Sequence, residues 1–462
     1  MKNNDYSRRR FLQTSGRAAL SIAALAGSVQ LEALAQASAQ SNNTDYKALV
    51  CILFAGGADS FNMLIPSDAA AYAEYRTTRT DLAIPQASLL SLGSGGENNG
   101  KALGLHPQMT GLQSLFMQGK LAFLSNVGTL VEPTSTRALQ AGTAKLPLGL
   151  YSHSDQISQW QTAVPDARSG SGWGGRIADL LSSQNTQQAI SMNISTAGSN
   201  EFQAGRNVDS YSITAGANAT PELYGYGESD SYGSAIEEIY RGSFHNIFRR
   251  SYSSLFNTAT AANAEFAAAL KAGQPLTTQF ANDELAQQLH TVARTIAANK
   301  LLGVRRQTFF VTYGGWDHHD EVLNSMNSML ANVNGAMVSF QAAMDELGLA
   351  NNVTTFTTSD FARTLSSNGR GSDHGWGGNA MIMGGAVNGG SVFGQYPSLA
   401  LNNPLDTGRG VLMPTTSLDQ YFADLALWFG VPASFLPDVL PNIGRFYDVA
   451  SAGTPLGRKL VG

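Results

Sequence analysis

The chain has 462 residues, a net charge of −5, 43% hydrophobic residues, 48 glycines and only 14% charged residues. This composition predicts a large apolar core with many loops and is unlike that of a disordered chain. Beyond the N-terminal leader there is no long run of Lys or Arg, so nucleic acid and anionic membrane surfaces are poor partners. The single cysteine, Cys51, lies in an apolar run and is expected to be a small buried hydrophobe.

The N-terminus has the features of a bacterial twin-arginine export signal. The motif Ser7-Arg8-Arg9-Arg10-Phe11-Leu12 precedes an apolar stretch at 18–29, and small residues suited to cleavage end at Ala39. That stretch is too short and too rich in alanine for a stable membrane span. We therefore expect a signal peptide at 1–39, a linker at 40–47, the twin-arginine translocase as export partner, and a periplasmic or secreted mature protein.

Hydrophobic periodicity predicts alternating strands and helices in the rest of the chain. Buried apolar strands are expected at 48–54, 121–127, 309–312, 353–358 and 380–383. Helices are expected at 69–79, 285–296, 326–347 and 418–429, and a further helix is expected to begin at 105–107. This alternation favours a mostly parallel sheet with right-handed crossovers, within one domain at 48–462. The stretch 193–233 is rich in Ser, Gly and Asn without periodicity and is expected to be a loop-rich insertion.

Three predicted strands end in an acid: Asp59, Asp317 and Asp360. In a parallel sheet the carboxyl ends of the strands meet at one edge, and a glycine-rich loop adds Asp373 and His374. Carboxylates and imidazoles that converge from separate loops are typical of divalent metal sites in hydrolases. Each acid also has a local alternative, since Asp is common in turns and at helix N-caps.

The densest group of potential metal ligands is Asp317-His318-His319, in a chain with only 7 histidines. Its alternative is the N-terminus of the following helix, in which Asp317 would be a cap. A second candidate group, Ser152-His153-Ser154, offers two possible serine nucleophiles and a possible catalytic histidine. Arg363 is a candidate clamp for an oxyanion. The Gly56-Gly57 pair lacks the third glycine of a dinucleotide fingerprint, so no nucleotide cofactor is expected.

Distinctive motifs lie along the chain at 7–12, 54–62, 105–107, 152–153, 172–173, 315–319, 359–363, 373–375 and 414–429. Together they resemble an exported bacterial domain-of-unknown-function family, family 1501, which is placed in the alkaline phosphatase and sulfatase superfamily. The resemblance implies a three-layer α/β/α sandwich with a mostly parallel sheet, like that of alkaline phosphatases and sulfatases. By superfamily analogy it also implies a metal-dependent hydrolase of phosphate or sulfate esters.

Carried over to this chain, the resemblance implies a set of metal ligands: Asp59, Asp317, His319, Asp360, Asp373 and His374. The cation would be zinc, manganese or calcium, and the substrate a small-molecule or carbohydrate ester. The chain departs from the family pattern at Asp360, where Glu is usual, and at Ala362, where Gly is usual. The alternative is a non-catalytic exported protein of the same fold that binds a glycan or a protein partner.

Overall fold

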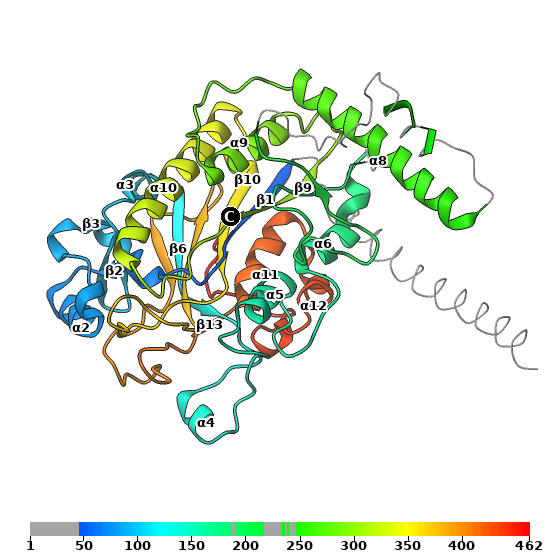
Figure 1. Ribbon diagram of the computed structural model, residues 1–462. Coiled ribbons are helices and arrows are strands. Elements are labelled where there is room, and N and C mark those ends of the chain that lie inside the picture. Colours follow the sequence, from blue (N-terminus) through cyan, green and yellow to red (C-terminus); the bar gives the residue numbers. More distant parts are fainter. Residues whose placement is uncertain (1–45, 187–189, 217–232, 236–237, 240–245) are drawn as a thin grey trace, which may run out of the picture.

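The computed structural model describes residues 46–186, 190–216, 233–235, 238–239 and 246–462 (Figure 1). The predicted signal peptide, most of the predicted linker and part of the 193–233 insertion lie outside these residues. The last linker residues belong to the fold, because Tyr46 is buried and the first strand begins at Lys47. Within the described part of the chain, no helix has the length and apolarity needed to cross a membrane.

A nine-stranded sheet forms the centre of the molecule, in the order β12-β6-β11-β10-β1-β9-β7-β8 with β13 beside β6. Its strands are β1 Lys47–Phe54, β6 Leu121–Gly128, β7 Asn193–Ser195, β8 Tyr211–Ser212, β9 Arg306–Tyr313, β10 Val353–Ser359, β11 Gly378–Met383, β12 Ser391–Gly394 and β13 Thr416–Ser417. All pairings are parallel except those of β11, which runs antiparallel to β10 and β6. The predicted mostly parallel sheet is confirmed.

Helices cover both faces of this sheet (Figure 1). One face carries α3 Thr110–Met117, α9 Glu284–Ala297 and α10 Val322–Glu346, and the other carries α5 His153–Thr162, α6 Trp173–Leu181, α11 Leu418–Phe429 and α12 Leu436–Val439. Strand β1 contributes side chains to the hydrophobic cores on both faces of the sheet, because successive side chains of a strand point to opposite faces. Val50 and Ile52 belong to the core with α9 and α10, whereas Leu49 and Leu53 belong to the core with α6 and α11. The three-layer α/β/α sandwich is therefore confirmed.

The remaining elements lie around this sandwich. They are the strands β2 Leu64–Pro66, β3 Leu90–Ser91, β4 Glu97–Asn98 and β5 Lys101–Leu105 of a small sheet, and the helices α2 Ala69–Arg79, α4 Thr136–Gln140 and α8 Ile247–Ala272. The helix expected to open at 105–107 begins only at Thr110, because Leu105 still pairs with Leu64 as the end of β5. The 193–233 insertion is not all loop, since it contributes β7 and β8 to the edge of the main sheet.

The parallel register aligns the ends of three central strands. Phe54 at the end of β1 lies beside Tyr313 of β9 on one side and Ser359 of β10 on the other. The loops that follow these strands therefore leave the sheet at the same edge. This edge carries the site described below.

A buried aspartate on α11 predicts how the folding stability of the protein depends on pH. Burial raises the pKa of Asp419, on α11, to about 7. Such a group keeps its proton in the folded state after the unfolded chain has lost it at about pH 4, so folding becomes less favourable as pH rises from about 4 to 7. We expect Asp419→Asn to raise the free energy of unfolding by about 1–2 kcal/mol at pH 8 and to change it little at pH 4. Urea unfolding at both pH values measures this. The exposed Asp438→Asn is the control, and an equal effect at both pH values would contradict the prediction.

Candidate metal centre

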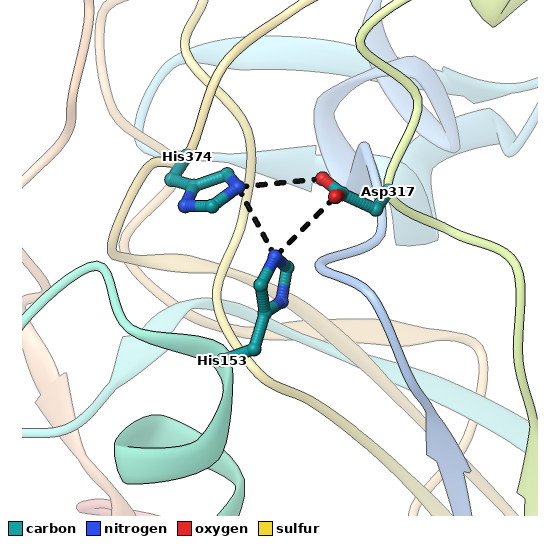
Figure 2. Close-up of side chains that lie close together, drawn as sticks. All are labelled: His153, Asp317 and His374. Carbon is teal, nitrogen blue, oxygen red and sulfur yellow. Dashed lines mark hydrogen bonds and ion pairs between the residues drawn. The ribbon is translucent and has the colours of Figure 1, made fainter.

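Three side chains from distant parts of the sequence meet at this edge of the sheet (Figure 2). His153 is the first residue of α5, Asp317 lies in the loop after β9, and His374 lies in the loop between β10 and β11. Each of these three residues offers one potential ligand atom, and the three atoms lie within 4.8 Å of one another. The Nε2 atoms of His153 and His374 are 3.1 Å apart, and each lies 3.4 Å from an oxygen of Asp317.

A third imidazole extends this group. Nε2 of His319 lies 3.1 Å from Nε2 of His374 and 3.0 Å from Oδ1 of Asp317. The side chain of His319 is 46% exposed, whereas that of His374 is 26% exposed. His319 therefore forms the solvent side of the cluster.

The other ring nitrogen of each histidine has a partner that orients the ring. Nδ1 of His374 donates to the backbone carbonyl of Tyr151 at 2.8 Å, Nδ1 of His153 lies 2.7 Å from Oδ2 of Asp360, and Nδ1 of His319 lies 3.1 Å from Oδ1 of Asp373. A carbonyl or carboxylate at Nδ1 places the proton there and leaves the lone pair on Nε2. All three lone pairs then face the cluster, as in metal sites whose histidines are held by outer partners.

This arrangement passes a chemical test for a divalent cation. Two Nε2 lone pairs 3.1 Å apart repel each other unless a positive charge lies close to both. Zinc binds imidazole nitrogen at about 2.0–2.1 Å, which puts tetrahedral ligand atoms roughly 3.3 Å apart. The separations of 3.1 and 3.4 Å among His153, His374 and Asp317 are of this size. The donor set fits a cation that accepts both imidazole nitrogen and carboxylate oxygen.

The electrostatics of the site favour the binding forms of two of these donors, His374 and Asp317. Burial lowers the pKa of His374, which favours the neutral imidazole. Burial works against ionisation of Asp317, but the hydrogen bond and the charge of Arg363 lower the pKa of this carboxyl below its usual value. Imidazole and carboxylate bind a metal only when they are deprotonated.

Arg363 is placed differently from the sequence prediction. Its side chain is fully buried, and its guanidinium forms an ion pair with Asp317 and donates to the backbone carbonyls of Gly56 and Ser372. A guanidinium committed to these partners cannot serve as the expected oxyanion clamp. Arg363 instead anchors Asp317 to the loop after β1 and to the loop that carries His374.

The family comparison covers most of the described chain. Residues 46–408 match the model of the family described as protein of unknown function (DUF1501). The chain belongs to the DUF1501 family. A search of curated proteins finds no match for this DUF1501 protein.

Solved structures similar to this DUF1501 protein include sulfatases. The PsFucS1 sulfatase from Pseudoalteromonas sp. is 11% identical, with 94% of this chain and 76% of that chain covered and a TM-score of 0.39. Ps i-CgsB in complex with k-i-k-neocarrahexaose is 10% identical, with coverages of 84% and 72% and a TM-score of 0.35. A 2-O GAG sulfatase is 9% identical, with coverages of 90% and 74% and a TM-score of 0.30. Likenesses of this size carry no argument about activity.

Among the predicted ligands, the structure brings Asp317, His319 and His374 together and gives other contacts to Asp360 and Asp373. The carboxylate of Asp360 binds Nδ1 of His153 and also accepts the backbone N–H of Gly56 at 3.0 Å. Asp373 contacts Nδ1 of His319 and forms an ion pair with Arg409. In the DUF1501 chain these two acids therefore orient imidazoles and are not members of the inner group, which is formed by His153, Asp317 and His374.

Asp59 does not lie with the cluster. It is fully buried in an ion pair with Arg79, whose Nη1 also donates to the carbonyl of Thr364 at 2.9 Å. The chain turns directly after β1 into a short 3-10 helix, Ser60–Asn62, with Asp59 before it. Asp59 is held through its ion pair with Arg79, the last residue of α2.

The predicted serine nucleophiles lie beside His153 at the start of α5. Ser152 precedes the helix, and its hydroxyl lies 3.3 Å from that of Ser154 and also hydrogen-bonds to Asp155. His153, predicted as a catalytic residue, belongs to the inner group with Asp317 and His374. His318 is buried beside Trp316.

Sequence reasoning missed the backbone carbonyl of Tyr151 as a partner of His374. Tyr151 has a φ of 73°, which is unusual for a residue other than glycine. The carbonyl carries no side-chain signal that a sequence motif could reveal.

Proposed function

We propose that this protein is an exported, metal-dependent hydrolase of phosphate or sulfate esters. The observation that carries the proposal is the convergence of three imidazole Nε2 atoms on the carboxylate of Asp317, with every Nδ1 committed to an outer partner. A purely structural role would not require three lone pairs to face one another. A divalent cation bound there would act as a Lewis acid toward a phosphoryl or sulfuryl oxygen.

His153, Asp317 and His374 are the residues proposed to hold the cation, with His319 beside them on the solvent side. Three protein ligands leave a position free for substrate, which is typical of catalytic rather than structural sites. Of the three expected cations, zinc suits imidazole donors best, because calcium and manganese favour oxygen ligands.

The outer residues have positioning roles in this proposal. Asp360 and Asp373 orient His153 and His319, and Arg363 holds Asp317. Arg409, whose side chain is 61% exposed, forms an ion pair with Asp373 and so holds the carboxylate that orients His319. Outer partners of this kind commonly change metal affinity or activity 10- to 100-fold when they are removed.

We expect protein purified without added chelator to retain about one zinc or manganese per chain after dialysis, and to hydrolyse p-nitrophenyl phosphate or p-nitrophenyl sulfate. Chelation should abolish that activity, and added metal should restore it, since the cation supplies the electrophile. Elemental analysis and a colorimetric assay measure both. A protein that retains no metal and hydrolyses neither ester would instead support the non-catalytic binding protein.

The export part of the proposal rests on the leader, which lies outside the described residues. Twin-arginine signals require their arginine pair, so Arg8→Lys with Arg9→Lys should leave a full-length precursor in the cytoplasm. Cell fractionation and immunoblotting detect this precursor. Replacement of Lys2 by Arg keeps the leader charge and is the control. Normal export of the double variant would contradict the proposed route.

A further inference from the structure

A second feature of the same sheet edge is an open cleft of about 410 Å³ beside the metal centre. Helix α5 forms one wall, with Ser154, Ser158 and Gln161 facing the cleft. The ends of β1 and β9 form its floor, and the loop that follows β7 forms the opposite wall. A cleft of this volume is in the range of small-molecule sites.

The described residues that line the cleft are suited to an uncharged polar ligand. Hydroxyl and amide groups come from both walls, Leu53 and Phe310 give an apolar floor, and Ile157 adds an apolar side chain to the α5 wall. Among the described lining residues there is no Lys, Arg or His, and the one ionisable side chain is the exposed Glu201. A phosphate or sulfate group would find no positive charge here and would be repelled by the Glu201 carboxylate.

The cleft and the metal centre are built on the same elements, α5 and β9. His153 and Ser154 are consecutive residues in the first turn of α5, one a member of the cluster and the other a part of the cleft wall. Phe310 and Thr312 of β9 line the cleft, and the same strand leads to Asp317. Gln161 is held in place, because its Oε1 accepts the N–H of Phe202 at 2.9 Å. Rigid elements therefore set the cleft at a fixed position relative to the cluster.

We propose that this cleft binds the uncharged, hydroxyl-rich alcohol part of the ester, which is a sugar unit. The inference rests on the proposed function, in which the anionic group lies at the metal centre. Hydroxyl and amide side chains over an apolar floor match the alternating hydroxyl groups and C–H faces of a sugar ring. The cleft would select the substrate, while the metal centre carries the chemistry.

The test fills the cleft without touching the metal centre. Ser158→Phe places a ring in the cleft, and Ser114→Phe, on an exposed position of α3, is the matched control. A second variant, Glu201→Phe, covers the opposite wall from an exposed position, so the test survives if Ser158→Phe does not fold. Binding of lactose, maltose and cellobiose is measured by saturation-transfer NMR, with and without chelator. Hydrolysis of galactose 6-sulfate and galactose 6-phosphate is compared with that of the p-nitrophenyl esters.

We expect the wild-type protein and Ser114→Phe to bind at least one of the disaccharides, and the cleft variants to lose this binding at least tenfold. For the sugar esters, the cleft variants should raise KM about tenfold, and for the aryl esters they should change it less than twofold. Sugar binding that is absent in the wild-type protein, or unchanged in a folded cleft variant, would overturn the inference. Sugar binding that depends on the cleft, in a protein that hydrolyses none of the esters, would keep the cleft as a sugar site and overturn the proposed function.

Discussion

Replacement of His374 by alanine is expected to remove the bound metal and to lower the melting temperature only when metal is present. His374 lies at the centre of the cluster, with Nε2 3.1 Å from the Nε2 atoms of both His153 and His319. A metal that binds only the folded state stabilises it by about 2.7 kcal/mol when its free concentration is about a hundredfold above its dissociation constant. The variant should lose that stabilisation and all hydrolytic activity. His319→Ala should show the same pattern with a smaller loss, because this histidine lies on the solvent side.

The control for this prediction is His290→Ala. His290 lies on α9 and stacks on Phe280 with ring centroids 4.9 Å apart, outside the cluster. Any loss of stability in this variant should be the same with and without chelator. Thermal unfolding of the three variants and the wild-type protein, in zinc and in chelator, separates the two kinds of effect. If His374→Ala destabilises the protein equally in both buffers, then His374 has a packing role and not a ligand role.

Replacement of Arg79 by methionine is expected to destabilise the protein by about 3–5 kcal/mol, because it leaves the charge of Asp59 buried without its partner. Both side chains of this ion pair have 0% exposure. The guanidinium also joins α2 to the loop after β10 through the carbonyls of Thr364 and Leu365. The double variant Arg79→Met with Asp59→Leu should recover part of the loss, since it removes both charges together.

This prediction also decides whether Asp59 is a ligand. If Asp59 is only the ion-pair partner of Arg79, Asp59→Asn should leave the metal occupancy of the protein unchanged. If Asp59 is a metal ligand, the variant protein should bind less metal. Elemental analysis of folded Asp59→Asn and chemical unfolding of Arg79→Met in zinc and in chelator give the two readouts. Loss of metal from Asp59→Asn, or a loss of stability below about 1 kcal/mol in Arg79→Met, would contradict the assignment.

Much of the fold could be predicted because it depends on local patterns. The continuous apolar run of β1 indicated a strand buried on both faces, and its alternate residues fill the two cores. Helix α11 begins and ends with local signals, namely a capping box of Ser417 with Gln420 and a left-handed Gly430. The antiparallel direction of β11 had no such signal, because strand direction follows from the path of the preceding loop.

The sequence also determined which loops reach the site. Acids and histidines that follow parallel strands must leave the sheet at one edge, and this places Asp317, His319 and His374 near one another. What it could not determine is the direction in which each side chain turns once it is there. That direction depends on partners far away in the chain.

Asp59 and Asp360 illustrate this limit. Both follow central strands. Asp59 forms an ion pair with Arg79, the last residue of α2, whereas Asp360 accepts a hydrogen bond from the ring of His153, 207 residues away in sequence. Only the tertiary structure brings α5 over the end of β10 and so makes one carboxylate orient an imidazole while the other remains buried in an ion pair. A buried charge must find an opposite charge or a hydrogen-bond donor, and packing decides which of these lies within reach.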